Sequence, residues 1–413
     1  MQRRRIVMLV ENTSFERDRR VRQEAIALDR AGCNVSVVCP RDREHSAPRF
    51  DAIDNIKVYR FGTLRNTHGA FGYCMEYGWA MLVSAAFVVW IWLTDGFDVL
   101  HAANPPDLYC LLAAPFRLLG KKFVYDQHDL CPELLEEKIG HAGPLGAIVK
   151  VLERWSYKLA SMVIVTNKSA YEIALVRGAT AEKTCIVRNG PDLEFLVSVP
   201  ECKALKGEAE FLAVYVGAMA QQDGVDCIVK AMHHIVHTRG RRDLKVAMLG
   251  DGDCLSDLKR LARALKVESY IHFAGWVDAE ELLSYVSTAE LCLAPEPPKA
   301  INQLSTFIKV MEYMSCGKAT VTFDLLETRR TAGSAAMYVS SYGPGAFGDA
   351  ILNLLDDAGT REKMGRLAAE RVRTSLHWGL SREVLLDSYE RAIWNGLDLC
   401  DESNRVAEET SID

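Results

Sequence analysis

The amino-acid sequence predicts an α/β protein made of two doubly wound domains, each with a parallel sheet covered by helices on both faces. Short apolar strands alternate with helical stretches almost throughout the chain, which is the pattern of such sheets. The alternation breaks at Asn189-Gly190-Pro191-Asp192 and the polar segment after it, and then resumes. With 413 residues, of which 49% are hydrophobic and 25% charged, the chain is long enough for two such domains.

The expected strands fall into two sets on either side of that break. The first set covers residues 5–10, 35–39, 56–61, 98–102, 123–126, 162–165 and 184–187. The second set covers residues 211–216, 245–249, 270–273, 291–294, 319–323 and 337–339. We therefore expect an N-terminal domain at 1–196, a linker at 197–210, a C-terminal domain at 211–396 whose last helix can pack back on the first domain, and a disordered acidic tail at 397–413.

Charge and cysteine usage exclude several classes of protein. The formal net charge of −6 and the pI near 6.0 argue against nucleic acid as the main partner, which would need a basic face. The 12 cysteines show neither Cys-x-x-Cys nor paired Cys/His spacing, so we expect no zinc site and no disulfide framework. Reduced thiols of this kind indicate a cytoplasmic protein.

One apolar run, from Trp79 to Leu93, is interrupted only by Ser84. It is shorter than the roughly 18 residues expected of a membrane-spanning helix. It has almost no polar face, so it is either a helix that covers the core or one that lies at a membrane surface, where its tryptophans suit the headgroup region. The sequence alone leaves both interpretations open.

The stretch from Ser305 to Lys318 is the most informative motif. Ser305 and Thr306 have the hydroxyls of a helix cap, and a capped helix N-terminus can bind an anion such as a diphosphate. Lys309 and Glu312 lie three residues apart and therefore share one face of the predicted helix. The alternative is an amphipathic helix with a weak surface ion pair.

Polar side chains follow two strands of the first domain. Asn104 comes after the strand at 98–102, and His128 follows the strand at 123–126. Because the carboxyl ends of parallel strands meet at one edge of a sheet, both side chains are expected in the same crevice. Arg20 and Arg22 belong to an arginine cluster after the first strand, which is either a phosphate or acceptor site or a solvated face paired with acids.

The second domain repeats a strand followed by a glycine turn. Gly217, Gly250 and Gly275 follow three successive strands, where backbone amides can face an anion or a base. Trp276 and Val277 come directly after Gly275. Glu296 follows the fourth strand, and we expect it at the rim of the cleft between the domains.

Together these residues resemble glycosyltransferase family 4, whose members are retaining nucleotide-sugar enzymes with the GT-B fold of two facing Rossmann-like domains and an interdomain cleft. The resemblance extends from Arg5 to about Trp394. The motifs that carry it are residues 18–25 in the first helix, 127–130, 188–192, 249–252 and above all 309–318.

The resemblance implies a role for each matching residue. Glu312 would accept from the ribose hydroxyls, Lys309 with Ser305 and Thr306 would hold the diphosphate, and His128 would contact the transferred sugar. Gly275, Trp276 and Val277 would contact the base. The first domain would bind the acceptor and the second the nucleotide sugar.

Two departures from the family pattern concern the donor site. The family usually has a glutamate eight residues before Glu312, where this chain has Leu304, so Glu296 or Asn302 would take that role. The family also often has arginine and lysine in the turn after the first strand of the second domain, where this chain has Ala218 and Asp223.

The implied activity is retaining transfer of a sugar without a metal ion or other cofactor, from a nucleotide sugar, with UDP-sugars as the expected donors, to a lipid-linked or polysaccharide acceptor. Such an enzyme would be cytoplasmic and could contact the inner face of the membrane through Trp79 to Leu93. Two alternatives remain open: a GT-B-fold sugar-nucleotide epimerase, and a non-catalytic nucleotide-sugar sensor or scaffold.

Overall fold

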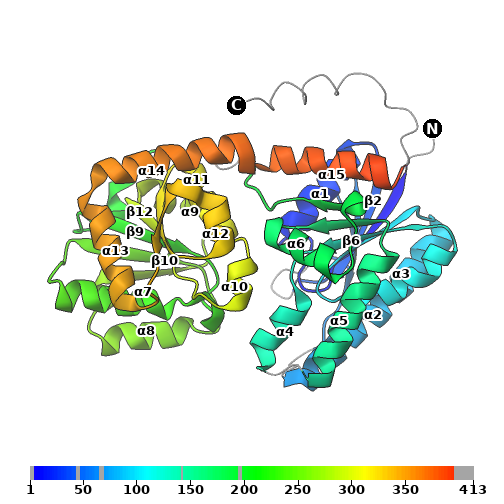
Figure 1. Ribbon diagram of the computed structural model, residues 1–413, viewed down its shortest axis with the longest axis horizontal. Coiled ribbons are helices and arrows are strands. Elements are labelled where there is room, and N and C mark those ends of the chain that lie inside the picture. The colour runs from blue at the N-terminus through cyan, green and yellow to red at the C-terminus, as the bar shows by residue number, and fades with distance from the viewer. Residues whose placement is uncertain (1–3, 43–46, 65–68, 141–142, 194–197, 395–413) are drawn as a thin grey trace.

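The computed structural model describes residues 4–42, 47–64, 69–140, 143–193 and 198–394, which form two sheets with helices on both faces of each (Figure 1). The predicted acidic tail at 397–413 lies outside the described residues. So do residues at the predicted boundaries 1–3 and 194–197, and the domain limits therefore stay predictions.

The first sheet has strand order β3-β4-β2-β1-β5-β6-β7-β8, and its neighbours are parallel except for β3 and β4. Its strands are β1 (Arg5–Leu9), β2 (Asn34–Pro40), β3 (Phe50–Ile53), β4 (Ile56–Phe61), β5 (Val99–Ala103), β6 (Lys122–Gln127), β7 (Met162–Val165) and β8 (Thr184–Ile186). The chain order reverses beside β1, so the crevice for a ligand lies where β1 and β5 end.

Every predicted strand of this sheet is present, but the sequence analysis missed β3. Its residues alternate between exposed and half-buried positions at the sheet edge, so no apolar run marks it. The strand pairs antiparallel with β4 through a two-residue turn in which Asp54 has φ 54°.

The second sheet is parallel throughout, with strand order β11-β10-β9-β12-β13-β14. Its strands are β9 (Phe211–Val216), β10 (Leu244–Leu249), β11 (Ile271–Gly275), β12 (Leu291–Ala294), β13 (Ala319–Phe323) and β14 (Ala336–Val339). The order reverses between β9 and β12, which places a second ligand crevice at the ends of these strands.

Helices cover both faces of each sheet (Figure 1). Those of the first half are α1 (Arg19–Arg30), α2 (Gly69–Thr94), α3 (Tyr109–Leu118), α4 (Cys131–Ile139), α5 (Gly143–Leu159) and α6 (Lys168–Arg177). Those of the second half are α7 (Asp226–His233), α8 (Leu255–Ala264), α9 (Ala279–Thr288), α10 (Ala300–Leu304), α11 (Ile308–Ser315), α12 (Leu326–Ala332), α13 (Pro344–Asp356), α14 (Ala358–Arg371) and α15 (Trp378–Ala392).

Successive side chains of the first sheet enter different cores. Val7 and Leu9 of β1 join a core with α2, α3 and α5, while Ile6 and Met8 join a core with α1 and α15. Both faces of a buried parallel sheet need apolar side chains, which is why these strands read as continuous apolar runs.

The last helix, α15, connects the two halves. It follows α14, which packs against α11 and β13 of the second sheet, and it then lies against α1 and β8 of the first (Figure 1). Leu385 and Tyr389 of α15 are buried in the first half's core, and the Tyr389 hydroxyl lies 2.7 Å from Nδ1 of the buried His101.

Helix α2 is longer than the apolar run predicted from the sequence. Its residues Met75–Thr94 are long and apolar enough to cross a membrane, with mean hydropathy 1.6, yet only 22% of the apolar window is buried. Ala80, Ser84, Val88 and Ile91 recur one turn apart and are buried toward the sheet. The helix therefore lies along the domain and leaves much of its apolar surface exposed.

Replacing Leu385 by alanine should lower the free energy of unfolding by about 2–5 kcal/mol, because a fully buried leucine would leave a cavity. Denaturant unfolding measures the change. Val384→Ala, at the half-exposed neighbouring position, is the matched control and should cost much less. Equal losses in the two variants would show that α15 does not contribute to the core of the first half.

Candidate functional site

A cavity of about 240 Å³ lies between the two halves, at the carboxyl ends of their strands. From the first half it is lined by the segment after β6, including His128, by residues after β7, including Asn167, and by Asn189. From the second half it is lined by Ile301, Leu304, Ser305 and Thr306. The cavity is therefore an interdomain site, and it includes three of the predicted site residues.

His128 is held by a buried carboxylate. Its Nε2 lies 2.5 Å from Oδ2 of Asp126, which belongs to the end of β6. Asp126 is fully buried and also receives two hydrogen bonds from Arg20, at 2.7 Å and 3.2 Å. Arg20 comes from the first turn of α1, which begins after β1 because Asp18 caps it through a side-chain bond to the amide of Val21.

This arrangement determines the charge of the imidazole. Burial disfavours the protonated ring, but the Asp126 carboxylate outweighs burial and raises the pKa of His128. Burial likewise opposes the charge of Asp126, yet Arg20 and His128 hold the pKa of Asp126 well below its usual range. The Asp126 carboxylate thus stabilises the protonated form of His128. The imidazolium can donate a second hydrogen bond from Nδ1.

Arg20 has little capacity left for a ligand. Its other contacts are the carbonyl oxygen of Val187 at 2.7 Å, Oδ1 of Asn189 at 2.6 Å and the buried carboxylate of Glu24 at 3.2 Å. The guanidinium is therefore placed to position Asp126 and the segment after β8. Arg22, the other predicted arginine, is exposed on α1.

Asn104 organises the segment that carries His128. Its Oδ1 accepts hydrogen bonds from the amides of His128 at 2.7 Å and Asp129 at 3.1 Å, and its Nδ2 donates to Asp107, to the hydroxyl of Tyr125 and to Asp129 O. Asn104 is 2% exposed. It contributes to the site by shaping the turn, and its side-chain amide is already satisfied by protein groups.

The three predicted glycines of the second half form a row across strand ends. The amide of Gly217 donates to Leu249 O at 3.0 Å, and the amide of Gly250 donates to Gly275 O at 2.7 Å. Gly250 has φ +129°, and a Cβ there would lie 2.0 Å from Gly217 O, so a larger residue does not fit.

A Cβ at Gly217 would meet Nζ of Lys309 at 2.8 Å, which places this glycine turn directly beside Lys309. Lys309 is largely buried, and its ammonium pairs with Oε1 of Glu296 at 2.5 Å and lies 3.2 Å from the Tyr215 hydroxyl. Burial lowers the pKa of Lys309, but Glu296 more than compensates, and the net shift is upward.

Glu296 is fully buried beside Lys309, so the expectation that it lies at the cleft rim is wrong. The segment after β12 folds inward because the ion pair with Lys309 satisfies its carboxylate there. Its second oxygen, Oε2, has no hydrogen-bond partner among the described residues. The same holds for Oδ2 of Asp223, whose pKa is raised by burial although Lys309 opposes that shift.

Glu312 lies one turn beyond Lys309 on α11 and is mostly buried. Its Oε1 receives a hydrogen bond of 2.6 Å from Arg19, which comes from α1 of the first half. The carboxylate assigned to the ribose from the sequence is thus joined to the opposite domain by an ion pair across the cleft.

The predicted hydroxyl cap is wrong. Helix α11 begins at Ile308 after Phe307, without a side-chain cap, because Ser305 ends the short helix α10 and its hydroxyl donates to Ile301 O at 2.8 Å. Thr306 instead accepts a hydrogen bond of 3.1 Å from Nδ2 of Asn167 in the first half. Both hydroxyl residues still line the interdomain cavity.

The remaining predicted residues surround this site without entering its cavity. Asn302 is buried and donates to Pro297 O at 2.9 Å, which fixes the segment after β12. Trp276 is 79% exposed at the end of β11, and Val277 packs partly against the core. An exposed indole beside the glycine row is available to a ligand, whereas Asn302 supports the local fold.

A metal ion is not needed to explain the carboxylates near His128. Among the described residues, Glu24, His101 and Asp126 bring ligand atoms within 4.8 Å of one another. Arg20 pairs with Asp126 at 2.7 Å and lies 3.2 Å from Glu24, and burial raises the pKa of Glu24 to about 8. Arg20 and the uncharged form of Glu24 therefore balance the charge of the group without a further cation.

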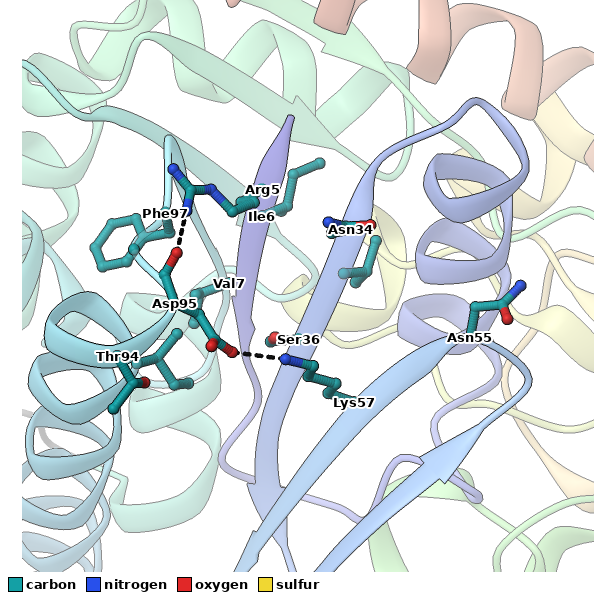
Figure 2. A pocket seen from close by; sticks show the side chains of 13 residues that line it. Arg5, Ile6, Val7, Asn34, Ser36, Asn55, Lys57, Thr94, Asp95 and Phe97 are labelled. Carbon is teal, nitrogen blue, oxygen red and sulfur yellow. Dashed lines mark hydrogen bonds and ion pairs between the residues drawn. The ribbon is translucent and has the colours of Figure 1, made fainter. Parts of the chain in front are cut away.

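A second cavity, of about 420 Å³, lies at the amino ends of the strands of the first sheet (Figure 2). It is lined by residues from the amino ends of β1, β2 and β4, including Arg5, Asn34 and Lys57. Lys57 pairs there with Asp95 at 2.6 Å, as Figure 2 shows. Ligands of doubly wound sheets bind at the carboxyl ends, so this cavity is separate from the candidate site.

Three residues of the site were missed as candidates. Arg19 and Asn167 act across the cleft, and nothing in their local sequence identifies a partner in the other half. Asp126 could have been found, because residues two apart on a strand share a face and Asp126 precedes His128 by two.

Two family profiles match the chain and together cover most of it. The family described as Glycosyl transferase 4-like domain matches residues 18–190, and the family described as Glycosyl transferases group 1 matches residues 210–357. The boundary between the two matches coincides with the passage from the first sheet to the second.

Curated relatives and solved structures agree with that assignment. A D-inositol 3-phosphate glycosyltransferase of Paenarthrobacter aurescens is 26% identical over 251 residues, 57% of this chain and 58% of the relative, so the chain spans about half the length of such relatives. Sucrose-phosphate synthase from Thermosynechococcus elongatus superposes with TM-score 0.78 at 18% identity, over 94% of this chain and 99% of that one.

Anabaena HepE in complex with UDP and glucose superposes with TM-score 0.68 at 16% identity, over 93% of this chain and 99% of that one. These superpositions show the fold, and they confirm the two Rossmann-like halves of the GT-B architecture expected from the sequence. The sequence profiles, which reach from residue 18 to residue 357, agree with the resemblance to family 4. The chain therefore belongs to the family 4 type of glycosyltransferases with the GT-B fold.

Proposed function

We propose that this protein is a retaining glycosyltransferase that moves a sugar from a UDP-sugar to a lipid-linked or polysaccharide acceptor. The observation that carries the proposal is the interdomain site itself, in which His128 on one half and Ile301, Leu304, Ser305 and Thr306 on the other line a single cavity. Glu312 and Lys309 follow on the same helix of the second half. Facing strand ends of this kind can hold donor and acceptor together.

The proposed donor side is the second half. The mostly buried carboxylate of Glu312 can accept hydrogen bonds from two hydroxyls of a ribose once Arg19 is displaced. A Cβ at Gly275 would meet no atom within 4 Å, so this turn is open to a nucleotide, and Trp276 beside it offers an exposed ring to a base. The complex of Anabaena HepE with UDP and glucose, on the same fold, favours UDP as the first donor to test.

The leaving diphosphate needs positive charge, which we assign to Lys309 and to the first amides of α11 rather than to a metal ion or another cofactor. Lys309 is positioned beside the glycine turn at Gly217. Glu296 holds the ammonium in place and keeps it protonated. The diphosphate would share this ammonium with Glu296.

His128 serves the transferred sugar and the acceptor. In a same-face substitution, the bond between the anomeric carbon and the diphosphate breaks, the acceptor oxygen forms the new bond, and a phosphate oxygen takes the acceptor proton. Held by Asp126, the imidazolium donates a hydrogen bond that orients the sugar, and it is not the nucleophile. Substrates of this class are made in the cytoplasm, where we place the protein.

The direct test is incubation of the purified protein with a panel of UDP-, GDP- and ADP-sugars. Release of free nucleoside diphosphate in the presence of an acceptor supports transfer. An isomerised donor would instead identify an epimerase, and binding without turnover would identify a nucleotide-sugar sensor.

Glu312→Gln should weaken donor binding by about 1.5–3 kcal/mol, because it removes a charged acceptor for two hydroxyls while keeping the shape. Calorimetry with UDP measures the loss. Arg19→Gln is the matched variant, since it removes the other partner of the same ion pair and frees Glu312. It should leave UDP affinity unchanged or higher, and unchanged affinity in Glu312→Gln would contradict the ribose assignment.

Lys309→Met combined with Glu296→Gln should lower kcat by about 10²–10³-fold, because the charge on the diphosphate grows as the glycosidic bond breaks. The pair is changed together so that no buried carboxylate is left without a partner. Glu296→Gln alone is the comparison and should lower kcat less, because the ammonium stays in the site although it loses the carboxylate that holds it. Normal turnover in the double variant would assign the diphosphate charge to other groups.

Asp126→Asn should move the alkaline limb of the pH profile of kcat/KM to lower pH. Asp126 raises the pKa of His128, so the imidazolium persists above the ordinary histidine range and is lost as pH rises through that raised pKa. His128→Ala should slow transfer, remove the limb and leave UDP affinity nearly intact. A limb that stays in His128→Ala would belong to another group.

A further inference from the structure

Three neighbouring helices on one face of the first half expose large apolar side chains. Helices α2, α3 and α5 cover the same face of the sheet, opposite α1 and α15 (Figure 1). The most exposed of these side chains are Leu82 at 69%, Leu93 at 71% and Leu118 at 91%. On α5, Ile148, Val151 and Trp155 are about half exposed. We call this surface the α2-α3-α5 face.

The exposure is too extensive for an ordinary soluble surface. Helix α2 alone also exposes Trp79, Val89, Trp90 and Trp92. Isolated apolar side chains on a surface need no explanation, but a contiguous set across three helices marks an interaction surface. Val88 and Ile91 are buried and hold α2 along the domain. The opposite side of the helix can therefore contact lipid while the helix stays packed on the protein.

The exposed charges of α5 and the charges at the end of α3 are basic, whereas α2 carries the half-buried Glu76 and is followed by Asp95. Every exposed ionisable side chain described on α5 is basic: Lys150, Arg154 and Lys158. At the end of α3, Arg117, Lys121 and Lys122 are half-buried and also basic. This is notable in a chain whose net charge is −6. Basic side chains interleaved with leucine and tryptophan suit an anionic lipid surface, where indoles lie at headgroup depth and cations contact phosphates.

An apolar cavity of about 390 Å³ lies beside this face. It is lined mainly by apolar groups of α2, α4 and α5, among them Leu135, Ile148 and Leu152. At its inner end it reaches Asp107 and Cys131, which contact the Asn104 side chain that shapes the turn of His128. A hydrocarbon chain inserted from this face would therefore end near the proposed acceptor side.

We propose that the α2-α3-α5 face docks on an anionic lipid bilayer. The docking goes beyond the transfer reaction proposed above and does not depend on it. It places the apolar cavity over the membrane, so that a lipid with a glycosylated or phosphorylated headgroup can reach the interdomain site while its tail stays in hydrocarbon surroundings.

Co-sedimentation of the full chain with vesicles tests the proposal. The vesicles contain phosphatidylcholine alone or with about 30% phosphatidylglycerol, at about 0.1 M and about 0.5 M salt. Wild-type protein should sediment with the anionic vesicles, and less so at high salt. Replacing Lys150 and Arg154 by glutamine should weaken binding about 25-fold, which corresponds to about fivefold for each cation near the surface.

Two apolar variants separate the contributions of the helices. Leu82→Glu with Leu93→Glu on α2, and Ile148→Glu with Val151→Glu on α5, should each lower vesicle binding by about tenfold or more. These positions are exposed, so the thermal midpoint should change little. Val384→Glu is the control, because it adds a single carboxylate to α15 on the opposite face, and its vesicle binding should stay within about twofold of wild type.

Retention of wild-type protein in the supernatant with both vesicle types would overturn the proposal. So would equal losses in the α5 variant and the Val384→Glu control. A concentration-dependent dimer that the α2 variant abolishes, without vesicle binding, would assign the face to a second copy of the chain. Nucleoside diphosphate release measured without vesicles keeps the two proposals apart, because it reports on the transfer site alone.

Discussion

The buried ion pair between Arg20 and Asp126 is the interaction on which the rest of the site depends. It joins the first turn of α1 to the end of β6, and the same guanidinium holds the carbonyl of Val187 and the side chain of Asn189 where the chain leaves the first sheet. A buried charge without its partner costs several kcal/mol, so a change to either member alone should lower stability as well as disturb the site. The pair therefore fixes His128, the helix that faces the cleft and the start of the connection to the second half in one arrangement.

Contacts between the two halves are mostly polar, and several come from the residues that would meet the donor. Arg19 binds Glu312, Asn167 binds the carbonyl of Leu304 and the hydroxyl of Thr306, and the buried carboxylate of Glu327 accepts from the amide and hydroxyl of Ser169 at the start of α6. Polar interfaces of this kind exchange partners more easily than apolar ones. The passage of the chain from α14 through the π-helical turn at 372–376 into α15 is the stronger tie, because Leu385 and Tyr389 are buried in the opposite core.

The sequence predicts the fold well because local and global signals agree along the strands. The central predicted strands are buried on both faces and therefore appear as apolar runs, whereas the exposed edge strand β3 has no such signal. In the site, helical spacing was enough to place Lys309 and Glu312 on one face of a helix. Their ion-pair partners could not be predicted. Glu296 reaches Lys309 only because the segment after β12 folds inward, and Arg19 reaches Glu312 only because the two halves are in contact. The cap at Ser305 was mistaken because its hydroxyl is equally able to bond backward and end a preceding helix.

Charge balance in the cleft follows from these pairs. Each of the cations Arg19, Arg20 and Lys309 already has a carboxylate partner, namely Glu312, Asp126 and Glu296. Of these, the pair of Arg19 with Glu312 has an exposed arginine, whereas both members of the other two are largely buried. Solvent screens an exposed pair and makes it the weakest of the three. If a ribose takes the carboxylate of Glu312, Arg19 is released from it. Under the proposed function, donor binding therefore breaks the weakest of the three ion pairs and with it one polar contact between the halves.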